Sequence, residues 1–235
     1  LAKLIAQEFF GDPAALIRFD MSEFMEKYSV SKLVGSPAGY VGYDEGGNLT
    51  EKVRRRPYSV VLLDEIEKAS PDVLNILLQV LDEGKLTDSK GRLIDFKSTV
   101  IVMTSNLGAE EFSRKIAKIG FADAGTATNE NFTLTKERVL EKTKEFFRPE
   151  LLNRIDHQVV FRPLERPVFD QIFKKELDEF LAQRAGTDGL TLPKFGPKKL
   201  REISEKIYDP QFGARPIGRY LHGELEHDIV QKLLK

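Results

Sequence analysis

The sequence contains no cysteine, no tryptophan and no apolar run long enough to span a membrane. Without cysteine the chain can form no disulfide framework, no thiolate nucleophile and no cysteine-ligated zinc site. A membrane helix needs about 18 consecutive apolar residues. The opening segment contains Lys3 and Glu8, so it does not resemble a signal peptide. These absences favour a reducing compartment and give no reason to expect a membrane partner.

An excess of one charge is absent as well. The chain has 36 Lys and Arg against 37 Asp and Glu, for a formal net charge of -1. A domain that binds nucleic acid through its phosphates usually carries a basic excess, so we expect no nucleic-acid partner. At about 100–200 residues per domain, 235 residues with 41% hydrophobic content predict two globular domains. Because the chain begins at Leu1 without Met, we expect a piece of a longer protein.

The chain does contain an alternation of apolar strands and amphipathic helices, which predicts an α/β layer with a parallel sheet covered by helices. After Pro163 the pattern is mainly helical. We therefore predict an α/β domain over 1–162 and a small helical domain over 163–235. The expected strands are 15–19, 58–63, 99–104 and 159–161, with a possible one at 190–192. The expected helices are 1–10, 48–56, 71–83, 134–147, 149–153, 167–184, 196–207 and 213–234, with a long loop over 118–133.

Two carboxylates, Asp64 and Glu65, end the most apolar of these strands. In parallel sheets the ligand lies at the carboxyl edge of the strands. There, one carboxylate can hold hydrated Mg²⁺ while its neighbour polarises a water. A strand end followed by a helix cap explains the same pair. Asn106 follows the next strand and could help to orient that water, although Asn is also a common turn former.

A glycine-dense loop, residues 35–47, could be mistaken for a phosphate cradle. Gly42 and Gly47 have the required separation, but Asn48-Leu49 stands where Lys and then Ser or Thr are needed. We therefore reject it as a phosphate loop. Its Tyr40 and Tyr43 suit a flexible loop that grips a polypeptide without reading its sequence, or a tight turn with packed tyrosines.

Arginine can stabilise charge that develops on a transferred phosphoryl group. Arg148, Arg154 and Arg215 are candidates for this role, although most surface arginines are simply solvated. His157 and the two other histidines have no metal-ligand spacing, and we assign them no chemistry.

In this order, the segments resemble the second ATPase module of the Clp unfoldases, in the AAA+ superfamily. The matching stretches are FDMSEFMEKYSVSKLVGSPAGYVGYDEGG, RRRPYSVVLLDEIEKASPDVLNILLQVLDEGKLTD, TVIVMTSNLGA, FRPELLNRID and DPQFGARP. The resemblance covers nearly the whole chain. It implies an AAA+ parallel sheet sandwiched by helices, followed by a small helical domain, with ATP and Mg²⁺ as cofactors.

The resemblance also implies roles for single residues. Asp64 would coordinate Mg²⁺, Glu65 would activate the hydrolytic water, and Asn106 would be the first sensor. Arg154 would be the finger that reaches a neighbouring subunit's nucleotide. Arg215 would be the second sensor and would face the γ-phosphate.

Two loops would face a central pore in a hexamer. Tyr40, with Val41 beside it, matches the axial residue that pushes substrate polypeptide, and residues 85–95 resemble a second pore loop. The expected partners are like subunits, unfolded or tagged proteins and possible adaptors. The expected location is the cytoplasm, or the stroma or matrix of an organelle of bacterial descent.

One part of the family pattern is absent. A GPTGVGKT-like phosphate loop should precede the helix that opens at Leu1. Because backbone N–H groups and a lysine of that loop hold the β- and γ-phosphates, we expect residues 1–235 alone to bind ATP poorly, while a full-length parent turns it over. We also expect the small domain to continue past Lys235.

The long loop favours one branch of the family. Members that supply a barrel-shaped peptidase carry a loop with an Ile/Leu/Val-Gly-Phe/Leu tip, and Ile119-Gly120-Phe121 lies in the corresponding interval. An exposed Ile and Phe can fill a hydrophobic pocket on a ClpP-type partner, unless they pack on the domain itself.

The leading hypothesis is therefore a peptidase-coupled unfoldase of the ClpC, ClpE and ClpA branch. The alternatives are a ClpB-type disaggregase, a binding module unable to hydrolyse nucleotide, and a DNA-acting ATPase, against which the balanced charge argues.

Overall fold

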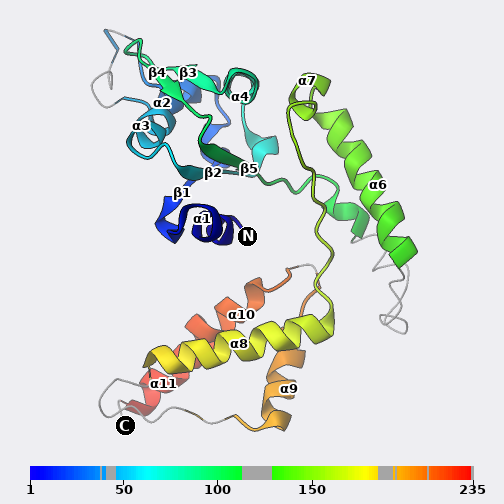
Figure 1. Cartoon of the computed structure of the whole chain (residues 1–235). Helices are drawn as coiled ribbons and strands as arrows, with labels where there is room; N and C mark the ends of the chain where they lie inside the picture. The colour runs from blue at the N-terminus through cyan, green and yellow to red at the C-terminus, as the bar shows by residue number, and fades with distance from the viewer. Residues whose placement is uncertain are drawn as a thin grey trace. The chain divides into compact units, whose positions relative to one another are not determined.

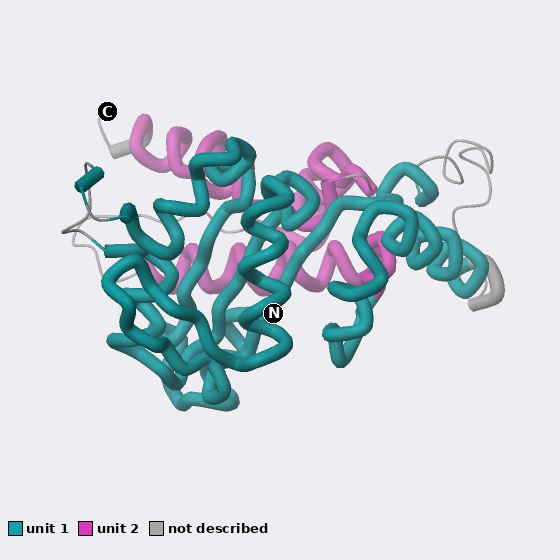
Figure 2. Tube along the Cα trace, turned by 90° about the horizontal axis from the view of Figure 1, so that it is seen from above, with its two compact units in different colours: residues 1–159 teal, residues 160–235 magenta. Residues whose placement is uncertain are grey.

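The computed structural model describes residues 1–37, 39–40, 46–112, 129–184, 193, 195–210 and 212–233. They form two compact units, Leu1–Val159 and Val160–Lys235, which are coloured separately in Figure 2. The division falls close to the domain boundary proposed after residue 162. No helix in the described ranges combines the length and the apolarity needed to cross a bilayer.

Unit 1 is built on a parallel sheet with the strand order β1-β2-β5. These strands are β1 (Leu16–Asp20), β2 (Ser59–Asp64) and β5 (Thr99–Met103). The register pairs Asp20 with Asp64 and Leu63 with Met103, so the carboxyl ends of the three strands meet at one edge (Figure 1). The parallel sheet expected from the alternating pattern is confirmed.

Helices cover both faces of this sheet, which explains why β2 is apolar throughout. Val60 is buried with Ala6 of α1 on one face, and Val61 belongs to the larger core on the other. The second face is covered by α2, α3 and α4. The helices of this region are α1 (Ala2–Phe10), η1 (Pro13–Ala15), η2 (Met21–Phe24), η3 (Lys27–Ser29), α2 (Val30–Val34), α3 (Asn48–Arg55), η4 (Ile66–Lys68) and α4 (Pro71–Glu83).

The boundaries of α4 follow from local chemistry. The Ser70 side chain accepts the N–H of Val73, and Pro71 occupies the first turn, where its missing N–H has no cost. Gly84 ends the helix in the left-handed conformation, with φ 64°.

A short antiparallel hairpin lies within residues 85–95, for which the sequence analysis expects no strand. It consists of β3 (Lys85–Thr87) and β4 (Leu93–Asp95). Only Leu86 and Ile94 of these strands enter the core, each 3% exposed. Two apolar residues are too few to give an alternating pattern.

Two expectations for residues 118–161 are wrong. Helix α6 (Asn129–Phe146) includes residues 129–133, which we expected to lie in a loop; α7 (Pro149–Leu152) follows it. Residues 159–161 form no strand: Val159 and Phe161 are 70% and 66% exposed, and no described strand pairs with them. A short apolar run needs both a ladder partner and a covering layer to become a strand.

Unit 2 is helical, as expected, and its core is centred on α8. Phe169, Phe173, Leu177 and Phe180 lie along one side of that helix and are buried. The predicted helix 213–234 is divided by a π-helical segment. The elements are α8 (Arg166–Arg184), α9 (Pro197–Ile207), α10 (Arg215–Arg219), η5 (Tyr220–Leu225) and α11 (Glu226–Leu233). The possible strand at 190–192 lies outside the described residues.

Candidate active site

The candidate site lies at the carboxyl edge of the sheet of unit 1, where β2 ends in Asp64. The next residue, Glu65, has φ 56° and ψ 51°, and among the described residues it alone has a positive φ without being glycine. A residue with a side chain adopts this left-handed conformation at a cost of about 1–2 kcal/mol. Glu65 is thus held in a sharp turn between β2 and η4.

Thr104, the residue after β5, ties the two strand ends together. Its N–H donates to the carbonyl of Leu63 at 3.0 Å, and its own carbonyl accepts the N–H of Ile66 at 2.9 Å. Its hydroxyl donates to Oδ1 of Asp64 and accepts the N–H of Glu65, the latter at 3.1 Å. Residue 104 therefore contacts both candidate carboxylate residues.

Asn106 lies at the same edge. Its Nδ2 donates to Oε1 of Glu65 at 3.4 Å, and its backbone N–H donates to Oε1 of Glu67 at 3.1 Å. The other carboxylate oxygen of Glu67 is buried and has no hydrogen-bond partner in the described part of the chain. The structure thus brings together Asp64, Glu65 and Asn106, which the sequence singles out separately.

Arg18 is a residue of this edge that the sequence analysis missed. Its guanidinium donates to Oδ2 of Asp64 at 2.5 Å, and the two side chains are 61% and 26% exposed. The register places Arg18 opposite Leu62 and Asp20 opposite Asp64, so Arg18 reaches Asp64 along the same face of the sheet. The sequence feature that could have drawn attention to Arg18 is its position as a charged residue in the middle of an apolar strand.

The donor set at this edge fits a hydrated Mg²⁺. The described residues hold no cluster of three or more metal-ligating side chains. Mg²⁺ keeps several waters and commonly uses one or two carboxylates together with substrate phosphates. Asp64 provides one such carboxylate at a partly exposed position.

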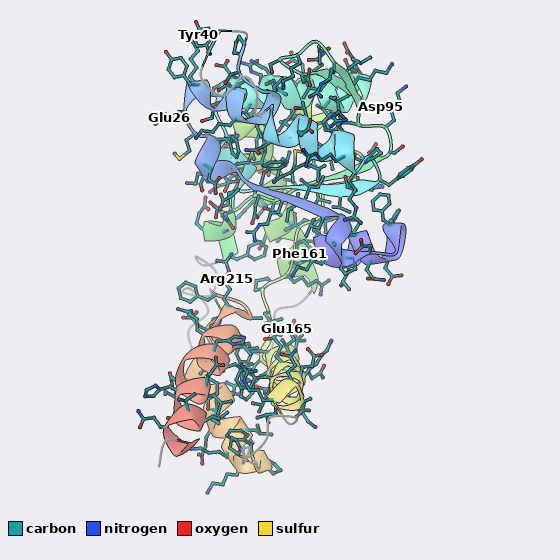
Figure 3. All side chains as sticks on the ribbon, turned by 90° about the vertical axis from the view of Figure 1, so that its left-hand side faces the viewer. Glu26, Tyr40, Asp95, Phe161, Glu165 and Arg215 are labelled. Atoms are coloured by element: carbon teal, nitrogen blue, oxygen red, sulfur yellow. The ribbon has the colours of Figure 1, made fainter. Side chains whose placement is uncertain are left out.

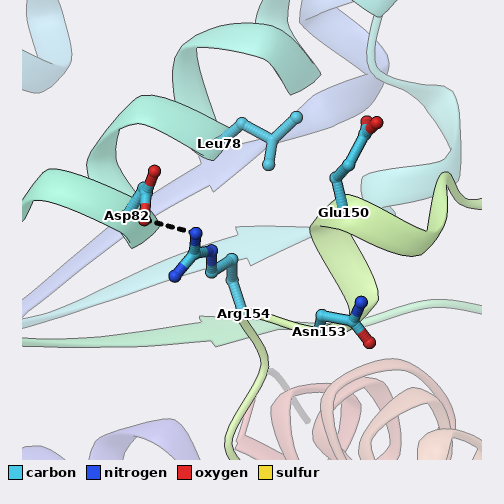
Figure 4. A pocket seen from close by; sticks show the side chains of 5 residues that line it. All are labelled: Leu78, Asp82, Glu150, Asn153 and Arg154. Carbon is cyan, nitrogen blue, oxygen red and sulfur yellow. Dashed lines mark ion pairs between the residues drawn. The ribbon is translucent and has the colours of Figure 1, made fainter.

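Arg154 lies after α7 and forms an ion pair with α4. Its guanidinium is 2.7 Å from Oδ1 of Asp82, and both side chains are 50% exposed. The pair borders a hollow of about 450 Å³ (Figure 4), whose lining residues are Leu78, Asp82, Glu150, Asn153 and Arg154. Arg154 is therefore accessible and is paired within its own chain. Arg148, at the start of α7, donates to Asn75 at 3.4 Å.

The remaining candidates are not joined to this edge by any described contact. Arg215 is an exposed residue at the start of α10, in unit 2. Tyr40 is 71% exposed and stands at the margin of unit 1 (Figure 3). Val41, Ile119, Gly120 and Phe121 lie outside the described residues.

The stem of the glycine-dense loop is closed by close backbone approach. A Cβ on Gly47 would lie 2.3 Å from the carbonyl oxygen of Leu33, and one on Gly35 would lie 2.2 Å from Oγ of Ser89. The Ser89 N–H donates to the carbonyl of Val34 at 3.1 Å. The stem of the Tyr40 loop therefore packs on the tip of the β3-β4 hairpin.

Charged groups join the hairpin to α3, the helix that follows the glycine-dense loop. Arg92 of the hairpin contacts both Asp88, at 2.6 Å, and Glu51 of α3, at 3.2 Å. Hydrogen bonds from Arg54 and Arg55 lower the pKa of Glu51 to about 2. Glu51 is therefore ionised at neutral pH and bridges α3 to the hairpin.

Two family models match the chain along most of its length. Residues 1–158 match the AAA domain (Cdc48 subfamily), and residues 164–235 match the C-terminal D2-small domain of ClpB protein. The chain therefore belongs to the Clp/Hsp100 family of AAA+ ATPases and corresponds to their second ATPase module.

Curated relatives and solved structures agree with this family. The chain is 49% identical to the chaperone protein ClpB of Oceanobacillus iheyensis and 48% identical to the negative regulator of genetic competence ClpC/MecB of Bacillus subtilis. Each match includes 100% of this chain and 28% of the relative. A structure of Hsp104 with ATPγS and FITC-casein superposes with a TM-score of 0.83 at 38% identity, over 99% of this chain and 38% of that one.

Proposed function

We propose that this chain is the ATP-hydrolysing module of a hexameric Clp-type motor that unfolds proteins and threads them through a central pore. The observation that carries the proposal is the hydrogen-bonded edge formed by Asp64, Glu65 and Asn106 in a chain of this family. Carboxylates at the carboxyl edge of a parallel sheet lie where such folds bind their ligands.

The residues at this edge suit attack by water on the γ-phosphate. Asp64 would hold Mg²⁺, whose charge offsets the negative charge of the phosphates. Glu65 would take a proton from the attacking water. The Asn106 amide, 3.4 Å from Glu65, would keep that carboxylate aimed at the water.

Two arginines would supply positive charge from outside this edge. Arg154 is half exposed beside an open hollow, which suits a side chain that acts on the nucleotide of a neighbouring subunit. Arg215 is exposed at the start of α10 and would contact the γ-phosphate from the small domain. An arginine of this type stabilises the charge of the transition state.

A polypeptide substrate is supported by the loop that carries Tyr40. The 71% exposed ring of Tyr40 stands on a stem braced against the β3-β4 hairpin, so movement of the domain would carry both segments along the pore. The Hsp104 structure contains casein, which favours a protein substrate for this chain too.

Glu65→Gln tests the proposed chemistry in the natural polypeptide that carries this chain. We expect ATP turnover to fall more than a hundredfold while a fluorescent ATP analogue still binds, because only the proton acceptor is lost. Glu8→Gln, an exposed change on α1, should leave turnover unchanged. Wild-type turnover in Glu65→Gln would contradict the proposal.

We further propose that the motor supplies a ClpP-type peptidase through Ile119-Gly120-Phe121. The near-equal identity to ClpB and ClpC supports a disaggregase as the second candidate. Deletion of residues 119–121 should abolish degradation of a tagged fluorescent protein by the peptidase and leave ATP turnover intact. Undiminished degradation would remove the role proposed for residues 119–121, whereas failure of the intact polypeptide to bind the peptidase would favour the disaggregase.

We propose a cytoplasmic location, or the stroma or matrix of an organelle, since ClpC relatives come from bacteria and from a chloroplast. Adaptor proteins that deliver substrates would be further partners.

A further inference from the structure

We infer that Thr104 is a positioning residue that sets the direction of both candidate carboxylates; this inference rests on the proposed ATPase function. Thr104 makes hydrogen bonds to each of four consecutive residues, 63 to 66. Its backbone bonds Leu63 and Ile66, and its hydroxyl bonds Asp64 and Glu65. No other residue in the described hydrogen-bond network of this edge reaches both carboxylate residues.

The two hydroxyl bonds have opposite directions and therefore different effects. The hydroxyl donates to Oδ1 of Asp64, which fixes the rotation of that carboxylate. The same oxygen accepts the N–H of Glu65 at 3.1 Å, which holds the backbone of Glu65 in its left-handed conformation. A hydroxyl can do both at once because it carries one donor and two acceptor lone pairs.

The backbone conformation of Glu65 decides where its carboxylate points. With φ 56° the chain turns sharply out of β2, and Oε1 of Glu65 comes within 3.4 Å of Nδ2 of Asn106. A side chain in this region is strained, and such strain persists only where surrounding contacts hold it. Thr104 supplies one of those contacts through its side chain, so the Glu65–Asn106 contact depends on a third residue.

Thr104 is exposed, which makes a clean test possible. Thr104→Val keeps the shape and removes both hydroxyl bonds, whereas Thr104→Ser keeps the hydroxyl. Thr99→Val is the matched control, because Thr99 lies on the same sequence segment and its hydroxyl donates to the carbonyl of Phe96, at 2.7 Å, before β5 reaches the edge.

The first measurement uses residues 1–235 and does not depend on ATP turnover. The Cα and Cβ chemical shifts of Glu65 report its backbone conformation. We expect Thr104→Val to shift both resonances and to speed exchange of the Glu65 amide at least tenfold, while Thr104→Ser and Thr99→Val leave them at their parental values. Unchanged Glu65 resonances in Thr104→Val would overturn the inference even if the ATPase proposal holds.

The second measurement is steady-state ATP hydrolysis by the natural polypeptide, with its oligomeric state checked by sedimentation. We expect Thr104→Val to lower kcat at least tenfold with KM for ATP within twofold, and Thr104→Ser to restore kcat to within threefold. A merely structural role would instead lower thermal stability without this split between kcat and KM. An equal loss of kcat in Thr104→Ser and Thr104→Val, or a loss of kcat in Thr99→Val as well, would overturn the inference. An unsubstituted polypeptide without turnover would overturn the proposed function alone.

Discussion

Replacing Gly47 by alanine should open the stem of the loop that carries Tyr40. Gly47 has φ -84°, which any residue adopts, so the need for glycine is steric. Its added Cβ would lie 2.3 Å from the carbonyl oxygen of Leu33, 2.3 Å from the carbonyl carbon of Val34 and 2.6 Å from the nitrogen of Gly35. All three are backbone atoms, which cannot rotate away as a side chain would.

The neighbouring Gly46 provides a matched control, because its backbone conformation disfavours a side chain although there is space for one. It has φ 72°, and an added Cβ would meet nothing within 4 Å, so Gly46→Ala introduces conformational strain without a clash. That strain costs about 1–2 kcal/mol. Inserting a methyl group into closely packed structure costs about 1–3 kcal/mol and occasionally more. Because the atoms that a Cβ on Gly47 would meet belong to rigid backbone, we expect Gly47→Ala to lower the free energy of unfolding by about 3 kcal/mol or more.

Urea unfolding measures the difference in stability between Gly47→Ala and Gly46→Ala. It is followed by far-ultraviolet circular dichroism, because the chain has no tryptophan whose fluorescence could report unfolding. With a urea dependence of about 1–3 kcal/mol per molar, Gly47→Ala should lower the midpoint by about 1 M or more. It should also speed exchange of the Ser89 amide, which donates to Val34 at the stem. A midpoint for Gly47→Ala at or above that of Gly46→Ala would refute the steric reasoning.

Two further predictions concern charged pairs. Hydrogen bonds from Arg54 and Arg55 lower the pKa of Glu51 from 4.5 to about 2, so its stabilising effect is complete above about pH 4.5 and is lost as the pH falls toward 2. Glu51→Gln should therefore lower the urea midpoint at pH 7 and not near pH 2; an equal effect at both would contradict this. Asp82→Asn should keep ATP turnover of the natural polypeptide within about fivefold of its parental value, because an exposed ion pair is worth about 1 kcal/mol or less, while Arg154→Ala should lower turnover more than a hundredfold. Equal losses in the two variants would show that Asp82 is needed for the chemistry itself.

The sheet and most helices could be predicted because burial shapes their sequences. The apolar strand ending at Asp64 is covered on both faces, and buried parallel strands are apolar along their whole length. Helix α4 has a serine cap, a proline in its first turn and a glycine after its end. Each of these signals is local in sequence, so no knowledge of distant contacts is needed to read it.

The parts that could not be predicted depend on contacts between distant residues. Residues 159–161 have the composition of a strand but no described partner. Thr104 and Arg18 are ordinary residues until the register places them beside Asp64. The requirement for glycine at position 47 likewise arises from the backbone of residues 33–35, which spacing within the loop cannot reveal.

The contacts at the candidate site divide into a fixed set and an exchangeable set. Thr104 holds Asp64 and Glu65 by hydrogen bonds that need no ligand, whereas Arg18 and Arg154 are held by exposed ion pairs. Such pairs contribute little to stability and are screened by salt. In the proposed mechanism, a divalent ion would therefore replace Arg18 beside Asp64, and a neighbouring phosphate would draw Arg154 from Asp82, with the direction of Glu65 unchanged. In the proposed ATPase cycle, this separation would keep Glu65 aligned while the charges around Asp64 and Arg154 change partners.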